Sequence, residues 1–250
     1  MIKFFRRIRQ RLLTENKPAS QVGRFSKYLL YAIGEVFLVV IGILFALQVN
    51  TWNENKIKTK KEIIHLENIL SSLQDDLDNQ ISPCVERTER QILGYELLKT
   101  GFYEKDNISN DSIRQLLFQF VGQWDLVLNT VVFDNLKSTG IDVLSNDSIK
   151  IKLLTLYGNN YEYVKSLQAS YDKFHYDGIT TLWHDNISAS IRLTDEDKEF
   201  LKNDKRFVSR FNSEGQYSLP NYLDELKNIK PKMQELIENI IQELKRLKEK

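Results

Sequence analysis

The residues best suited to chemistry in this chain are two histidines close to three aspartates. His175 and His184 lie in the stretch YDKFHYDGITTLWHDN, where Asp172, Asp177 and Asp185 supply carboxylates. Imidazole nitrogen and carboxylate oxygen are both zinc ligands, so a metal-dependent hydrolase is one function to consider. The separation of the two histidines matches no established ligand spacing, and zinc needs three or four ligands in a defined geometry. The pattern therefore gives this function little support.

The single cysteine, Cys84, does not indicate an enzyme either. It follows Pro83, and a thiolate nucleophile needs a histidine held beside it, which the sequence does not indicate. The sequence contains no GxSxG, HExxH, Walker or GxGxxG motif. We therefore expect no catalytic residue, no metal and no cofactor, and favour a non-enzymatic protein while leaving enzymatic activity open.

A long apolar segment, residues 28–49, predicts a transmembrane helix. It holds 22 residues with one charge, Glu35, and a helix of that length spans about 33 Å, close to the hydrocarbon thickness of a bilayer. Tyr28, Tyr31 and Trp52 flank it, as aromatic residues do at membrane interfaces. A buried core helix of this length would need a polar face, and a cleaved signal peptide would be shorter and followed by a small-x-small site.

Charge is distributed unevenly around this segment, and the asymmetry predicts its orientation. Residues 1–27 carry eight basic residues and one acid, whereas residues 50–250 carry 27 basic and 32 acidic residues. The positive-inside rule places the N-terminus in the cytoplasm and residues 51–250 outside it. Nucleic acid is not an expected partner of an acidic body of this kind.

The basic arm, residues 1–27, alternates apolar and basic residues in a pattern typical of an interfacial helix on anionic lipid. A purely topogenic role for the arm remains open. We expect the contacts to lipid headgroups from Arg6, Arg7, Arg9 and Arg11.

Glu35 lies about 10 Å inside the apolar segment, where a carboxylate is costly. Tyr31, Glu35, Gly42 and Ala46 share one helix face, and the last two form a small-xxx-small pair that lets another helix approach. This stripe predicts a helix–helix contact, in a homo-oligomer or with another inner-membrane protein. Extension of the carboxylate toward the headgroups is the competing interpretation.

Residues 50–250 predict a single helical domain, and the chain as a whole an all-α fold with long first and last helices. Glycine and proline are scarce. Heptad spacing indicates bundle core, or a coiled coil with other copies, and Pro83 is expected to end the first seam. The two seams are Ile63, Leu66, Leu70, Leu73, Leu77 and Ile81, and Leu226, Ile229, Met233, Leu236, Ile240, Leu244 and Leu247.

Between the seams, two similar helix starts occur, ISNDSIRQLLFQF and LSNDSIKIKLLTLY. Ser or Asn at these starts is expected to cap the first turn, and Gly140 to end the preceding helix. A long helix is expected over residues 148–176. The aromatic residues Phe118, Phe120, Trp124 and Phe133 are expected in the core, or lining a pocket.

The N-terminal signature KYLLYAIGE…VIGILFALQ-N-WNE, residues 27–54, resembles that of an uncharacterised family of bacterial single-span inner-membrane proteins. FDNLKSTGIDVLSNDSIKIKLLTLYGNNY resembles the family's second signature. The resemblance implies an inner-membrane anchor, a helical periplasmic domain and no established activity. The stretch PASQVG looks like a small insertion before the span.

The sequence thus favours a membrane-anchored scaffold or interaction component of the cell envelope. A periplasmic ligand-sensing domain that signals through a partner is the alternative, because 27 cytoplasmic residues are too few for an output domain.

Overall fold

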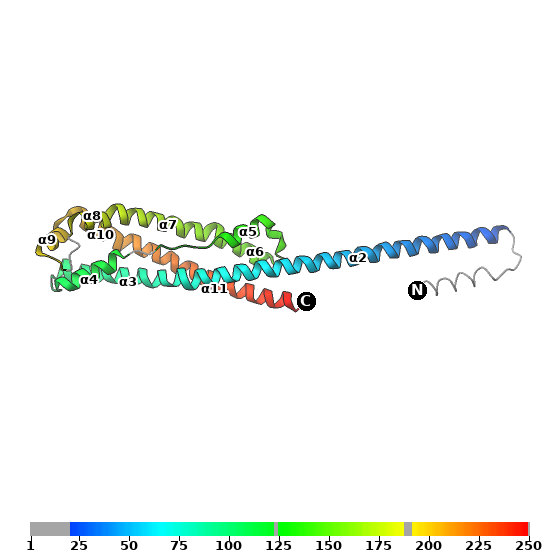
Figure 1. The fold of residues 1–250 in the computed structure, drawn as a ribbon, viewed down its shortest axis with the longest axis horizontal. Helices are drawn as coiled ribbons and strands as arrows, with labels where there is room; N and C mark the ends of the chain where they lie inside the picture. The colour runs from blue at the N-terminus through cyan, green and yellow to red at the C-terminus, as the bar shows by residue number, and fades with distance from the viewer. Residues whose placement is uncertain (1–20, 123–124, 188–191, 250) are drawn as a thin grey trace. The chain divides into compact units, whose positions relative to one another are not determined.

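The computed structural model describes residues 21–122, 125–187 and 192–249, and every regular element in these ranges is a helix (Figure 1). The predicted all-α fold is confirmed. The chain divides into two compact units, Met1–Lys58 and Thr59–Lys250. The division into arm, span and domain remains a prediction, because residues 1–20 of the arm lie outside the described residues.

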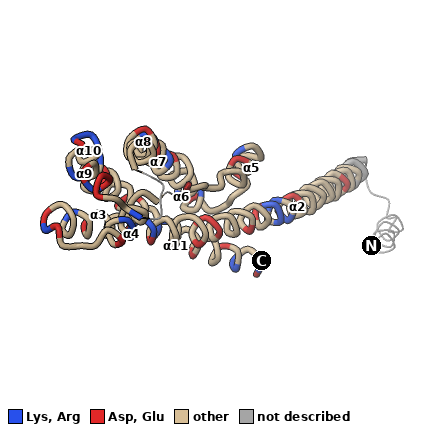
Figure 2. The backbone as a smooth tube through the Cα atoms, turned by 60° about the vertical axis from the view of Figure 1, so that its left-hand side comes forward, with Lys and Arg blue, Asp and Glu red and all other residues tan. Residues whose placement is uncertain are grey.

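The first unit contributes the start of helix α2, which runs from Gln21 to Asp75. Every side chain over residues 31–50 is exposed, although most of them are apolar. The helical run that contains them, Tyr31–Glu104, is long and apolar enough to cross a membrane, by length and composition. Figure 2 shows this part of α2 almost free of the charges that cover the helices of the second unit.

The second unit is a helical bundle built around three long helices, α3 (Ser82–Leu98), α7 (Tyr161–Phe174) and α11 (Leu219–Lys248). Helix α11 packs against both α3 and α7, and α4 packs along α3. In Figure 1, α5 and α6 lie at one end of the unit and α8, α9 and α10 at the other. The bounds of the shorter helices are Asn110–Val121 (α4), Val131–Thr139 (α5), Asp147–Thr155 (α6), Thr181–Asn186 (α8), Asp195–Asn203 (α9) and Lys205–Ser213 (α10).

Short π-helical segments occur along the helical runs of the described residues; most of them join consecutive α-helices, and η2 ends the run that contains α3. In a π segment the backbone bonds span five residues, which inserts one extra residue and turns the following side chains. Such segments occupy well under 1% of residues in ordinary proteins, so their repeated use here is a specific property of this chain. They are η1 (Asp76–Ile81), η2 (Lys99–Glu104), η4 (Leu156–Asn160), η5 (His175–Thr180) and η6 (Glu214–Ser218).

The π segments explain where the sequence expectations on helix ends fail. Pro83 was expected to end the first seam, but α3 begins at Ser82 and carries Pro83 in its first turn. The register change in η1 falls where a proline ring would otherwise meet an α-helical carbonyl. Similarly, the helix expected over residues 148–176 is confirmed as a helical run, interrupted by η4 and η5 and continued to Asn186.

The interior of the second unit consists of two hydrophobic clusters. Core 1 contains both predicted seams, from Leu66 to Ile81 and from Leu226 to Leu247, with Ile63 and Leu70 at its edge. This outcome favours the bundle interpretation of the heptad spacing. Core 2 is richer in aromatic side chains and is filled by residues of α3, α4, α10 and η2, among others.

The predicted caps form as expected. The Ser109 and Asn146 side chains accept hydrogen bonds from the first-turn amides of α4 and α6. Gly140 follows α5 with φ 100°, a conformation that a side chain would strain, and its N–H bonds to the Leu136 carbonyl.

Candidate functional site

A layer of buried polar side chains lies where the two cores meet. Thr88, Gln91 and Gln168 fall between residues of core 1 and core 2 along α3 and α7, whereas the other members belong to one core or lie next to core 2 residues. Buried polar groups cost free energy unless they are hydrogen-bonded, so their partners decide what they do. This polar layer consists of Cys84, Thr88, Gln91, Gln168, Tyr171, His175, Glu214 and Tyr222.

One half of the polar layer is a chain of bonds through Tyr222. The Tyr222 hydroxyl donates to Gln168 Oε1 at 2.7 Å, and the Leu126 amide donates to the same oxygen at 3.3 Å. Because the hydroxyl proton is used there, the Cys84 thiol donates to the Tyr222 oxygen, 3.4 Å away. Burial raises the pKa of the Cys84 thiol above its usual value. Cys84 is therefore a structural thiol and a poor nucleophile.

The other half of the layer is organised by Gln91. Its amide nitrogen donates to the Phe120 carbonyl at 3.0 Å and to the Gly122 carbonyl, and lies 3.1 Å from the Tyr171 hydroxyl. These bonds satisfy carbonyls at the C-terminus of α4, which lack partners within the helix. The Tyr171 ring stacks on His175, with centroids 5.4 Å apart.

His175 and Glu214 form the most deeply buried pair of a basic and an acidic side chain among the described residues. His175 Nδ1 lies 2.7 Å from Glu214 Oε1, and the two side chains are 1% and 0% exposed. Each residue is the first of a π segment, η5 and η6 respectively. We infer that the changed register turns both side chains inward, as π segments often do at functional positions.

A second buried carboxylate belongs to Asp76, the first residue of η1. Its side chain lies among residues of core 1. It accepts hydrogen bonds from the Asn129 amide at 3.0 and 3.2 Å and from the Tyr161 hydroxyl at 2.8 Å. Burial raises the pKa of the Asp76 carboxyl above 3.8, and the two donors offset only part of that effect. Asp76 thus ties the segment before α5 to η1 and α7.

This raised pKa predicts a pH dependence of stability. Above about pH 4 the unfolded chain has lost the Asp76 proton while the folded chain still binds it, so stability falls as pH rises through the folded pKa. Asp76→Asn keeps an acceptor for both donors and should flatten this part of the curve. Urea unfolding between pH 4 and 7 measures it. Asp78→Asn, at an exposed carboxylate of the same segment, should leave the wild-type slope unchanged; equal slopes in all three proteins would contradict the assignment.

The LSND stretch of the second signature is held by two carboxylates from distant helices. Glu62 Oε1 of α2 accepts from the Ser145 amide at 2.6 Å and from its hydroxyl at 2.8 Å. Asn146 donates to Glu243 of α11 at 3.1 Å, and Arg246 pairs with the same carboxylate. The stretch therefore positions the start of α6 against the first and last helices.

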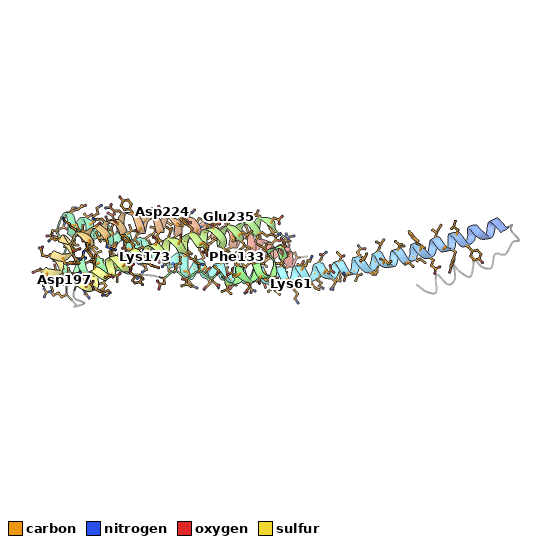
Figure 3. The ribbon with its side chains drawn as sticks, turned by 90° about the horizontal axis from the view of Figure 1, so that it is seen from above. Lys61, Phe133, Lys173, Asp197, Asp224 and Glu235 are labelled. Atoms are coloured by element: carbon orange, nitrogen blue, oxygen red, sulfur yellow. The ribbon has the colours of Figure 1, made fainter. Side chains whose placement is uncertain are left out.

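Phe133, which is labelled in Figure 3, belongs to the same signature. Its ring stacks on that of Tyr157, with the two centroids 4.5 Å apart. Phe133 and Phe120 are buried, as expected, and Trp124 lies outside the described residues. The expectation for Phe118 is wrong. Its side chain is 54% exposed, because α4 turns Ile113, Leu117 and Phe120 inward instead.

The histidine–aspartate stretch does not converge in the structure. His175 is buried in the polar layer, whereas His184, Asp177 and Asp185 are exposed. Among the residues that the structure describes, no group of three or more histidine, cysteine, aspartate or glutamate side chains is placed to hold a metal ion. Asp172 instead lies 3.4 Å from the Gln168 amide.

The predicted membrane contact residues Tyr31, Glu35, Gly42 and Ala46 all lie exposed on α2. Apart from the adjoining residues and backbone of α2 itself, nothing in the described part of the chain lies within 4 Å of a Cβ placed on Gly42. Their helix–helix contact stays a prediction. Arg6, Arg7, Arg9 and Arg11 lie outside the described residues.

Sequence reasoning singled out His175 and Cys84 as chemically capable residues and missed the other members of the polar layer. A signal was present on α7, where Val164, Gln168, Tyr171 and His175 follow the helical period and polar residues interrupt an apolar stripe. Glu214 carried no such signal, because it lies in the polar stretch NSEGQYS.

Comparisons with known proteins place the chain in a family. Residues 35–179 match a family of unknown function (DUF6090). The match begins within the apolar part of α2, includes the clamped LSND stretch and ends in η5, so it contains His175 but not Glu214. No curated protein and no solved structure matches the chain. The chain belongs to this family of unknown function.

Proposed function

We propose that this protein is a membrane-anchored interaction component of the bacterial cell envelope. In this proposal α2 crosses the inner membrane, the basic arm binds anionic lipid headgroups in the cytoplasmic leaflet, and the helical bundle works in the periplasm. The observation that carries it is the apolar part of α2. Its side chains over residues 31–50 are exposed to whatever surrounds the chain, and an apolar surface of this kind requires lipid or a partner helix.

The body of the protein supports a role in protein contact. Its buried polar groups bond to one another and to backbone carbonyls, which gives a well-defined framework for a binding surface. Within the membrane, the Glu35 face with Gly42 and Ala46 is the proposed contact with a second copy or with another inner-membrane protein.

The orientation is tested with a cysteine placed at an exposed position. The native Cys84 is 2% exposed, so an impermeant maleimide should not label wild-type protein in intact or lysed spheroplasts until it is denatured. Ser138→Cys places a thiol on the exposed face of α5. We expect this variant to be labelled in intact spheroplasts. Labelling of Ser138→Cys only after lysis would place the body in the cytoplasm and contradict the proposal.

The membrane contact is tested with Glu35→Leu. This change removes the one charge of the apolar segment, so insertion should be at least as complete as in wild type. Association should weaken, with crosslinked oligomer or recovered partner falling several-fold. Val40→Leu, on a different face of α2, is the matched control and should associate like wild type. Undiminished crosslinking of Glu35→Leu would show that the carboxylate does not mark the interface.

A further inference from the structure

The structure fixes how many protons the His175–Glu214 pair must hold. His175 Nε2 lies 3.1 Å from the carbonyl oxygen of Val121. A carbonyl oxygen only accepts hydrogen bonds, so Nε2 carries a proton. His175 Nδ1 lies 2.7 Å from Glu214 Oε1, a distance at which two bare acceptors would repel. A second proton therefore lies between Nδ1 and Oε1.

We propose that this pair is a proton-dependent latch that joins η5 to η6 and holds the C-terminal end of α4. With the second proton present, the pair is neutral as a whole, either as imidazolium and carboxylate or as imidazole and carboxylic acid. Without it, one negative charge remains in an interior where His175 and Glu214 are 1% and 0% exposed. A buried uncompensated charge of this kind is costly, so loss of the proton opens the latch.

No neighbouring group among the described residues replaces this proton by transferring one of its own to the pair. Among the described residues, His175 is the ion-pair partner of Glu214. The Tyr171 hydroxyl is buried beside Glu214. Burial first, then the charge of Glu214 and a hydrogen bond to it, raise the pKa of this hydroxyl, so Tyr171 keeps its proton and does not transfer it to the pair. The titratable groups on the elements packed around the pair include Tyr171, Asp172 and Tyr176 of its own helical run, Arg87 and Tyr95 of α3, Arg210 of α10 and Tyr222 of α11.

The two arginine side chains in this group pack against the backbone of glycine residues, and neither forms an ion pair with Glu214 in the described part of the chain. Arg87 lies against Gly122, beside the Val121 carbonyl that fixes the imidazole, and Arg210 lies against Gly178 of η5. Arg210 also stacks over Phe174, 5.7 Å from its ring centre. Tyr95 contacts η6 through Gly215. Removal of the second proton therefore leaves the charge of Glu214 facing the lone pair of Nδ1.

The sign of the pH effect follows from counting protons in the two states. In the unfolded chain a histidine loses its proton with a pKa of about 6.5 and a glutamic acid with a pKa of about 4.3. Above neutral pH the unfolded pair therefore lacks the second proton that the folded pair binds. Stability falls as pH rises, by about tenfold in the unfolding equilibrium constant per pH unit for one proton.

Glu214→Gln is the decisive variant, because it keeps the hydrogen bond without the extra proton. The amide nitrogen of the E214Q side chain donates to Nδ1, and Nε2–H still donates to the Val121 carbonyl. Full-length wild-type and variant protein in detergent micelles are unfolded with urea at half-unit intervals from pH 6 to 9, followed by circular dichroism. We expect the wild-type unfolding constant to rise about tenfold per unit more steeply than that of E214Q.

Glu62→Gln is the matched control. Glu62 is also a buried carboxyl side chain, but its partners are the Ser145 amide and hydroxyl, which both donate to it, and not a histidine nitrogen. This variant should keep the wild-type slope. A wild-type slope no steeper than that of E214Q would overturn the latch.

A second measurement needs no variant, in case E214Q does not fold. The calorimetric unfolding enthalpy of the wild type at pH 8 is compared in phosphate and in Tris, whose ionisation enthalpies differ. We expect a difference that corresponds to release of about one proton on unfolding. Equal enthalpies in the two buffers would overturn the latch independently of any substitution.

Discussion

Replacing Gly215 by alanine is expected to destabilise the second unit by about 3 kcal/mol, through overpacking of a core that has no room for a methyl group. A Cβ at this position would overlap the ring of Tyr95, which is fully buried. The Tyr95 ring cannot move aside without losing hydrogen bonds. Its hydroxyl donates to Asn212 at 3.2 Å and accepts from Gln216 at 2.8 Å, so any shift breaks bonds at its far end.

Gly158→Ala is the control for this prediction. Gly158 also lies in a π segment, η4, but nothing occupies the space within 4 Å of its Cβ position. We expect its stability to equal or slightly exceed that of wild type, because alanine lowers the entropy of the unfolded chain. Urea unfolding followed by circular dichroism compares the three proteins. If Gly215→Ala and Gly158→Ala behaved alike, close packing of Tyr95 on η6 would not be a stability determinant.

Truncating Phe211 to alanine is expected to cost about 4 kcal/mol, within the range for a buried phenylalanine. Phe211 is 1% exposed and is the centre of the aromatic contacts of core 2. Its ring centroid lies 4.8 Å from that of Tyr95, 4.9 Å from that of Phe120 and 5.1 Å from that of Tyr103. The substitution therefore removes contacts to α3, α4 and η2 together and leaves a cavity between them.

Phe118→Ala gives the matched comparison, since Phe118 is 54% exposed. Its ring packs edge-on with that of Trp183, with centroids 5.6 Å apart, and lies beneath the Arg114 guanidinium. We expect a loss of less than about 1 kcal/mol, typical of a surface position. The midpoint of urea unfolding should separate the two variants clearly. Comparable losses would mean that core 2 does not depend on Phe211.

Local chemistry in the sequence was sufficient to predict the helices and much of the interior. Residues at three- and four-residue steps must share a face of a helix, so both seams could be assigned to a core from their spacing. The same is true of the Ser109, Asn146 and Gly140 caps, which depend on a few neighbouring atoms. The apolar length of α2 likewise depends on composition alone.

The π segments could not be predicted, because a pattern with a 3.6-residue period has no position for the extra residue that each of them inserts. Pro83 illustrates this: its local effect is to stop a helix, yet η1 lets the run continue into α3. Each π segment also rotates the side chains that follow it about the helix axis, and a regular 3.6-residue period does not predict this rotation. Faces assigned from the sequence beyond such a segment are therefore shifted.

The buried polar pairs depend on tertiary packing rather than on any local pattern. His175 and Glu214 come from α7–η5 and α10–η6, and Asp76 meets Tyr161 across 85 residues of sequence. No local rule brings such residues together, because their partners are chosen by how whole helices pack. Composition and spacing were enough to specify a helical protein with one apolar segment fit for a membrane. The packing of the bundle then selected which polar groups were buried and which donor each of them faced.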